Sequence, residues 1–339
     1  MHALRFVAMI SLFIALATPT ATLAGEEAVS FKSGDLSLSG TLILPAGEGP
    51  FPAVVFVHGS GAETRDNSSY SARWLASIGY AALIYDKRGT GKSEGSDDDW
   101  RRFSFENLAN DVVAAVDYLK SHKKIDSDKI GLHAASQGGW VAALATSKTK
   151  AIRFMVIKSA SVCTVGEDRI FERSARLARE GFSAEEISQA KEMQLVEAKR
   201  PDDTRPDPYN VLFEKYKNAR WFSRVYPGDS PTTEALVSYR TWYATIVDFD
   251  PVKLLKESDV PVCWIFGDPE LDQSGPVEAS IAAVSDLKEQ GKPYLTLQFE
   301  EQGHNIEESV YERALFDWLN DVNDYQGYEF KKHWDQFEK

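Results

Sequence analysis

Hydrophobic and polar residues follow two periods along the chain, one typical of buried strands and one typical of helices. The run from Ala53 to Val57 is apolar throughout, which is typical of a strand buried on both faces of a parallel sheet. Helix-like and strand-like segments then alternate: helices near 69–78, near 105–121 and after 136, and strands at 81–85, 129–132 and 154–159. This order predicts an α/β fold with a mostly parallel central sheet and crossover helices.

Two features interrupt this order. Strand-like segments at 29–31 and 36–44 enclose a polar turn, which predicts an N-terminal antiparallel hairpin. Between about 164 and 258 helical patterns follow one another, and Ser183 with Glu186 has the spacing of a capping box. The sheet order then resumes with a strand at 260–266, a helix near 276–290, a strand at 294–299 and a helix at 306–322.

We therefore predict one sheet domain built from residues 25–163 and 259–339, the second part ending in a C-terminal tail. Residues 164–258 would form a helical cap over the carboxyl edge of the sheet, where open α/β sheets bind ligands. The cap is rich in aromatic residues. Most of them are expected to form its own core, and a few to line a pocket.

Residues 1–24 have the pattern of a secretory signal peptide. Arg5 precedes an apolar run, 6–17, that is short for a membrane span, and Thr22-Leu23-Ala24 offers small residues to a signal peptidase. We expect cleavage after Ala24 and export to the periplasm or the medium; a membrane anchor is the alternative. No later stretch of the sequence is apolar enough to span a bilayer.

Net charge and cysteine content limit the kinds of partner and of disulfide that the sequence allows. The formal net charge is −13 and basic residues are not clustered, which argues against a nucleic-acid partner. The two cysteines, Cys163 and Cys263, do not form a disulfide framework. Both are expected to be buried thiols, although an exported protein could form one bridge.

The stretch 129–144 carries the strongest chemical signal, because an apolar run stops at Ser136 and a helix pattern with small residues follows. This is the pattern of a nucleophile elbow, which holds a serine in a strained turn above the sheet. The only literal G-x-S-x-G surrounds Ser93 instead. Ser93 lies among loop residues, where we expect no strand before it and no helix after it. Gly91-Lys92-Ser93 also imitates a phosphate-binding loop, but Asp86 stands where the first glycine is required.

A serine nucleophile needs a base and an acid. His304 is the candidate base, because it lies on the loop after the strand at 294–299, at the sheet edge where Ser136 also emerges. The acid should lie on the loop 267–276. Asp272 is preferred because the chain there can fold back toward His304, and Glu270 is the competitor because its side chain reaches further.

The developing negative charge on a substrate carbonyl oxygen needs two N–H donors. One candidate is the backbone N–H of Gln137, which follows the nucleophile. The other is the backbone N–H of Ser60 in the turn His58-Gly59-Ser60-Gly61, where His58 is expected to brace the turn. This chemistry requires no metal and no organic cofactor.

These motifs together resemble the α/β-hydrolase superfamily, and bacterial serine esterases in particular. The resemblance covers nearly the whole chain after residue 24, and it implies hydrolysis of small-molecule carboxylic esters through an acyl-enzyme, with peptidase or acyl-transfer activity in some members. The motifs are His58 to Gly61 with Arg65-Asp66, Asp86 to Ser93, Ser136 to Trp140, and Gly303-His304.

Two departures from the family pattern bear on the site. Ala134 replaces the usual elbow glycine, and two additional residues separate Gly267 from Asp272, which leaves the choice of acid open. An amidase or peptidase would use the same groups. A binding protein on a hydrolase scaffold remains the alternative of a different class, and neither substrate nor oligomeric state follows from the sequence.

Overall fold

The computed structural model describes residues 25–197, 207–226 and 233–324, so the predicted signal peptide and most of the C-terminal tail lie outside the described residues. Within them, eight strands form one sheet in the order β1-β2-β4-β3-β5-β6-β7-β8. Their bounds are Gly25–Ser33 (β1), Leu36–Leu44 (β2), Phe51–Val57 (β3), Ala81–Tyr85 (β4), Ile125–Ala135 (β5), Ile152–Lys158 (β6), Val262–Phe266 (β7) and Tyr294–Gln298 (β8).

The sheet confirms the predicted mostly parallel arrangement with an N-terminal antiparallel hairpin. β1 pairs with β2 and β2 with β4 in antiparallel register, whereas the pairs from β4 to β8 are parallel. Gly34 has a φ of 57°, a conformation that glycine adopts without steric cost, and it turns the chain between β1 and β2. Every residue of β3 is buried, as its continuous apolar run predicts.

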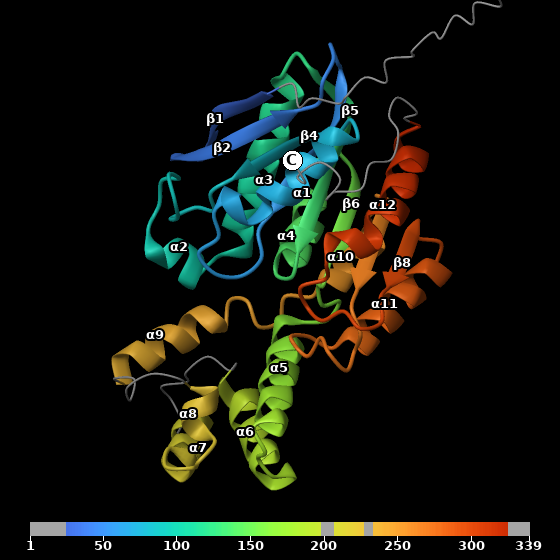
Figure 1. The fold of residues 1–339 in the computed structure, drawn as a ribbon. Coiled ribbons are helices and arrows are strands. Elements are labelled where there is room, and N and C mark those ends of the chain that lie inside the picture. Colours follow the sequence, from blue (N-terminus) through green and yellow to red (C-terminus); the bar gives the residue numbers. More distant parts are fainter. Residues whose placement is uncertain (1–24, 198–206, 227–232, 325–339) are drawn as a thin grey trace, which may run out of the picture.

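Helices cover both faces of the sheet, which gives three layers (Figure 1). One face packs against α3, α4, α10 and α11 through a core that includes Val55, Val116 and Val284. The other face packs against α1 and α12 through a core that includes Val54, Trp74 and Leu315. The bounds are Ser69–Ser77 (α1), Phe105–Ser121 (α3), Gly138–Lys148 (α4), Pro251–Glu257 (α10), Val277–Glu289 (α11) and Glu308–Asn323 (α12).

The segment between β6 and β7 forms a helical cap beyond one end of the sheet (Figure 1). Its helices are Val165–Arg179 (α5), Ala184–Glu197 (α6), Pro208–Tyr216 (α7), Phe222–Val225 (α8) and Thr233–Tyr243 (α9). Ser183 and Glu186 form the predicted capping box, with N–H to carboxylate and N–H to hydroxyl distances of 2.8 and 3.3 Å. The cap has a core of its own, made of aromatic and aliphatic side chains that include Tyr209 and Trp221.

The structure differs from the expected elements at two places. α10 packs against α4, so the last residues of the expected insertion 164–258 belong to the helical layers of the sheet domain. The expectation that no helix follows the Ser93 loop is wrong, because α2 occupies Asp97–Arg101. The Ser96 N–H and hydroxyl both donate to the Asp99 carboxylate, at 2.7 and 3.0 Å, and so cap a helix too short to show a hydrophobic period.

Cys163 and Cys263 are both free thiols; Cys263 is buried in β7 and Cys163 is half-buried. In the described part of the chain, no helix is both long enough and apolar enough to cross a bilayer.

Candidate active site

The turn between β5 and α4 holds Ser136 in a left-handed backbone conformation, with a φ of 51°. Such a conformation costs a non-glycine residue about 1–3 kcal/mol and is found mostly at functional sites. Two residues later, a Cβ on Gly138 would lie 2.7 Å from the Val57 carbonyl oxygen and 2.8 Å from that of His58. Glycine is therefore required there, and the turn has the geometry of a nucleophile elbow.

His304 and Asp272 form a hydrogen-bonded pair. The His304 Nδ1 lies 3.0 and 3.2 Å from the two carboxylate oxygens of Asp272, which is 2% exposed. The Ser274 N–H donates to the same carboxylate at 3.1 Å and fixes its orientation. Glu270, the competing candidate, is exposed on the same loop. A carboxylate on Nδ1 holds the imidazole with Nε2 available as a base.

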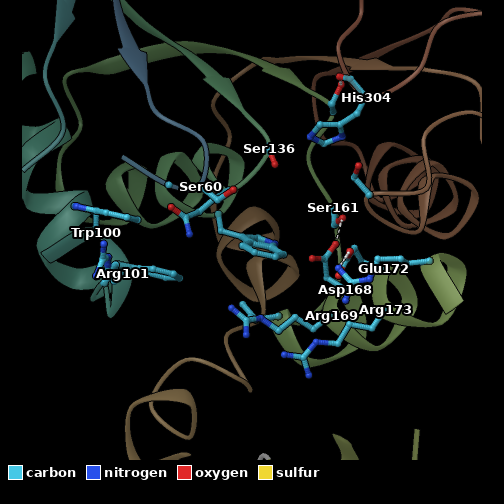
Figure 2. A pocket seen from close by; sticks show the side chains of 18 of the residues that line it. Ser60, Trp100, Arg101, Ser136, Ser161, Asp168, Arg169, Glu172, Arg173 and His304 are labelled. Atoms are coloured by element: carbon cyan, nitrogen blue, oxygen red, sulfur yellow. Dashed lines mark hydrogen bonds and ion pairs between the residues drawn. The ribbon is translucent and has the colours of Figure 1, made fainter. Parts of the chain in front are cut away.

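Ser136 and His304 line one cavity of about 690 Å³ between the sheet edge and the cap, which we call the cap cavity. Its other lining residues include Ser60, Gln137, Trp242 and a row of side chains on α5. Figure 2 shows the Ser136 hydroxyl directed into this cavity. Among the described residues no hydrogen bond joins Ser136 to His304; catalytic hydrogen bonds are often long before substrate binds.

The two candidate oxyanion donors lie at the same cavity. Neither the Ser60 N–H nor the Gln137 N–H donates a hydrogen bond to any other described residue, although both residues line the cap cavity. Gln137 directly precedes α4, so its N–H also lies at the positive end of that helix dipole. Both N–H groups are therefore available to an oxygen atom bound beside Ser136.

Lys87 connects the two loops that carry these donors, a role that no local sequence pattern indicates. Its Nζ donates to the carbonyl oxygens of Gly59 and Gly61, at 2.7 and 3.2 Å, and to the Gln137 side-chain oxygen at 3.0 Å. The side chain is 2% exposed. Burial lowers the pKa of the Lys87 ammonium to about 8, against the opposing charges of Glu63 and Asp111.

The alkaline limb of the activity should depend on Lys87. The kcat should fall as pH rises through about 8, because the ammonium then loses a proton that it donates to the two loops. Lys87→Met should lack this limb and lower kcat by up to about 10²-fold with little change in KM, since misplaced donors weaken the transition state rather than substrate binding. Initial rates of both proteins across the neutral and alkaline range measure this.

The neighbouring titratable groups are Glu63, Asp111 and His58. Desolvation and the nearby Lys87 charge lower the pKa of His58 to about 4, so its ring is neutral throughout that range. An alkaline limb that persists unchanged in Lys87→Met would assign the titration to another group.

The other motif residues build the scaffold around the site. The His58 Nε2–H donates to the Tyr85 carbonyl oxygen at 2.6 Å, which braces the turn as expected. Arg65 donates to both carboxylate oxygens of Asp86, at 2.9 and 2.7 Å, and these bonds help lower the pKa of Asp86 to about 2. The Ser93 hydroxyl donates to the Asp86 carbonyl oxygen at 2.6 Å and accepts the N–H of Ser39 at 3.0 Å. Ser93 therefore holds a loop to β2.

No group of three or more His, Cys, Asp or Glu residues in the described segments could hold a metal ion. The site is built from serine, histidine, aspartate and backbone N–H groups.

Comparison with known proteins identifies the family. The family model described as serine aminopeptidase, S33, matches residues 48–243, which extend from before β3 to the end of α9. The chain belongs to this family of α/β hydrolases.

The curated relatives include a thiohydrolase, a quorum-quenching protein and acyl-coenzyme A thioesterases. The chain is 28% identical to the thiohydrolase AneE of Aspergillus aculeatus, over 62% of this chain and 68% of the relative. It is 32% identical to the quorum-quenching protein AidA of Acinetobacter baumannii, over 33% of this chain and 36% of the relative. It is 31% identical to human acyl-coenzyme A thioesterase 1, over 38% of this chain and 28% of the relative. The matched parts of the last two thus span well under half of each relative.

Solved structures share the fold. The α/β hydrolase GrgF from a Penicillium species superimposes with a TM-score of 0.58 and 18% identity, covering 89% of this chain and all of that one. A Pyrococcus furiosus esterase superimposes with a TM-score of 0.56 and 17% identity, covering 88% and 91%. The protein is thus a hydrolase of the α/β-hydrolase fold.

Proposed function

We propose that the protein is an exported serine esterase that cleaves small-molecule carboxylic esters through an acyl-enzyme. One observation carries the proposal: a strained serine, a histidine paired with a buried carboxylate, and two unused N–H donors all meet at the cap cavity. A protein that only bound ligands would not need the strained turn at Ser136.

In the first half of the reaction, the His304 Nε2 takes the proton of the Ser136 hydroxyl as its oxygen attacks the ester carbonyl carbon. The carbonyl oxygen becomes an oxyanion and accepts hydrogen bonds from the N–H groups of Ser60 and Gln137. Asp272 accepts the His304 Nδ1–H and stabilises the imidazolium that forms. The imidazolium then protonates the leaving alkoxide, which departs as the alcohol and leaves the acyl group on Ser136.

In the second half, water takes the place of the alcohol. The His304 Nε2 removes a proton from water as its oxygen attacks the acyl carbonyl, and the same proton returns to the Ser136 oxygen when the acid leaves. The first half restores His304 and leaves Ser136 acylated, and the second half restores the Ser136 hydroxyl, so the two halves balance without an oxidant, reductant or metal.

Thioesters and amides could pass through the same steps. The family description names a serine aminopeptidase, and two relatives are named as a thiohydrolase and a thioesterase. We propose oxygen esters because the motif set resembles serine esterases and because amide cleavage requires protonation of a poorer leaving group. Parallel assays of an ester, a thioester and an anilide with the same acyl group would rank the three.

One labelling experiment tests nucleophile and export together. Protein expressed with its own N-terminus and recovered from outside the cytoplasm should react with a fluorophosphonate, and the labelled peptide should contain Ser136. The intact mass of the same sample should correspond to a chain that begins at Gly25, as cleavage after Ala24 predicts. Ser136→Ala is the matched control. A folded protein that takes up no label would contradict the hydrolase mechanism. Protein found only in the cytoplasm would contradict the export proposal alone, and exported protein that retains residues 1–24 would contradict cleavage after Ala24.

A further inference from the structure

The cap cavity has a charged wall that the proposed mechanism does not use. Residues three and four apart along α5 line it, so they share one face of the helix. Figure 2 shows Arg169 and Arg173 on the cap side of the cavity, across from Ser136. The charged residues of this face are Asp168, Arg169, Glu172, Arg173 and Arg176.

Two of the three α5 arginines that line the cavity are neutralised by carboxylates. The Arg173 Nη1 lies 3.0 Å from the Glu197 carboxylate, which is fully buried. The Arg176 Nη1 lies 3.0 Å from the Glu172 carboxylate. A fourth guanidinium at the cavity, that of Arg101, is 3.5 Å from a carboxylate of its own short helix. These groups present little net charge to a ligand.

Arg169 differs from the others. Among the described residues no carboxylate lies within 4.0 Å of its guanidinium, and its Nη1 donates to the Tyr239 hydroxyl at 2.6 Å. The guanidinium carbon lies 5.0 Å from the centre of the Tyr243 ring and 5.8 Å from that of Trp242. Arginine has five N–H donors, so the aromatic side chains hold the group in place while leaving donors for a ligand.

The neighbouring Asp168 does not form an ion pair with Arg169 either. Its carboxyl group accepts a hydrogen bond from the Ser161 hydroxyl at 2.5 Å. Burial raises the pKa of Asp168 to about 6, although the hydrogen bond from Ser161 and the charge of Arg169 act in the opposite direction. The charge of Arg169 is therefore only partly balanced inside the cavity.

We propose that Arg169 binds a carboxylate group of the substrate that lies at a distance from the reacting carbonyl group. The enzyme should therefore prefer anionic esters to neutral esters of the same size. The inference rests on the proposed esterase function. Arginine and carboxylate form two parallel hydrogen bonds, which orient a ligand as well as attract it. The cavity of about 690 Å³ contains both Arg169 and Ser136, so one small substrate can contact both.

Two matched pairs of esters test this. The first pair, 4-nitrophenyl hydrogen adipate and 4-nitrophenyl hexanoate, differs only by a carboxylate at the end of the acyl chain. The second pair, 4-carboxyphenyl hexanoate and 4-carbamoylphenyl hexanoate, places the carboxylate on the alcohol side. In at least one pair kcat/KM should favour the anionic ester about tenfold or more, mainly through KM. A ratio of one or below in both pairs would overturn the proposal.

Three variants assign the preference to a residue. Arg169→Met should reduce the ratio to near one, and Arg169→Lys should keep part of it because the charge remains. The control is Arg153→Met, which removes an exposed arginine of β6 that is paired with Asp128, and it should leave the ratio unchanged. A ratio that survives in Arg169→Met would assign the preference elsewhere.

Direct binding separates this inference from the proposed function. Titration calorimetry with adipate, which needs no turnover, should give a Kd about tenfold weaker for Arg169→Met than for the wild type. If adipate binding depends on Arg169 but no ester is hydrolysed, the anion-site proposal stands and the proposed esterase function is rejected. Equal adipate affinity in the two proteins would reject the anion site whatever the rates.

Discussion

Ser136→Ala should lower kcat for short 4-nitrophenyl esters by about 10⁶-fold, whereas Ser93→Ala should keep most of the activity. Ser136 lies in the strained turn between β5 and α4 and points into the cap cavity. Removing its hydroxyl removes the atom that would form the acyl-enzyme. Steady-state rates of the two purified variants decide between the serines.

The two variants should also differ in stability. The Ser93 hydroxyl makes two hydrogen bonds, one to Ser39 in β2 and one to Asp86 just after β4, so Ser93→Ala should lower the free energy of unfolding by about 1 kcal/mol. Ser136→Ala removes a hydroxyl that makes no hydrogen bond to any described residue, so this variant should unfold close to the wild type. If Ser93→Ala abolished activity while remaining folded, Ser136 would not be the nucleophile.

Asp272→Asn should lower kcat by about 10⁴-fold, whereas Glu270→Gln should have little effect. An asparagine oxygen at position 272 could still accept the Ser274 N–H, which would turn the amide NH₂ toward the His304 Nδ1. Nδ1 would then accept a hydrogen bond rather than donate one, so Nε2 would carry the ring hydrogen and could no longer act as base. Steady-state kcat measured for both variants with one ester tests the assignment.

Matched stability is the control, because Asp272 also shapes its own loop. Its carboxylate accepts the Ser274 N–H at 3.1 Å, so both variants should be compared by thermal unfolding before rates are interpreted. A severe loss in Glu270→Gln together with near-normal turnover in Asp272→Asn would transfer the role of the acid to Glu270.

Much of the fold could be predicted because its signals are local. The apolar run of β3 and the alternating segments after it specify buried parallel strands, and the structure confirms the resulting sheet with its hairpin. The α2 helix escaped prediction because five residues cannot show a period, although the Ser96 and Asp99 cap was present in the sequence. The boundary near α10 was missed because packing on α4, not composition, makes it part of the sheet layers.

The candidate site likewise has parts that the sequence predicts and parts that only the structure shows. The elbow at Ser136 is a strand, a turn and a helix in direct succession, and Gly138 is required by atoms close to that turn. His304 follows β8 directly, so its place at the sheet edge follows from chain order. By contrast, the approach of Asp272 rather than Glu270 to His304 depends on how the loop after β7 packs against the loop after β8.

The sequence by itself therefore determined the sheet, the turn that holds Ser136 and the loop that carries His304, because backbone hydrogen bonding and side-chain periodicity act over a few residues. Only the tertiary structure decided that Asp272 meets His304, that Lys87 lies beneath both candidate oxyanion loops, and that Arg169 faces the cavity without a close carboxylate. These contacts join segments distant in the chain. Their geometry depends on how the layers of the fold pack together. The helical period of α5 shows which of its residues share one side of the helix, but it does not show which side faces Ser136.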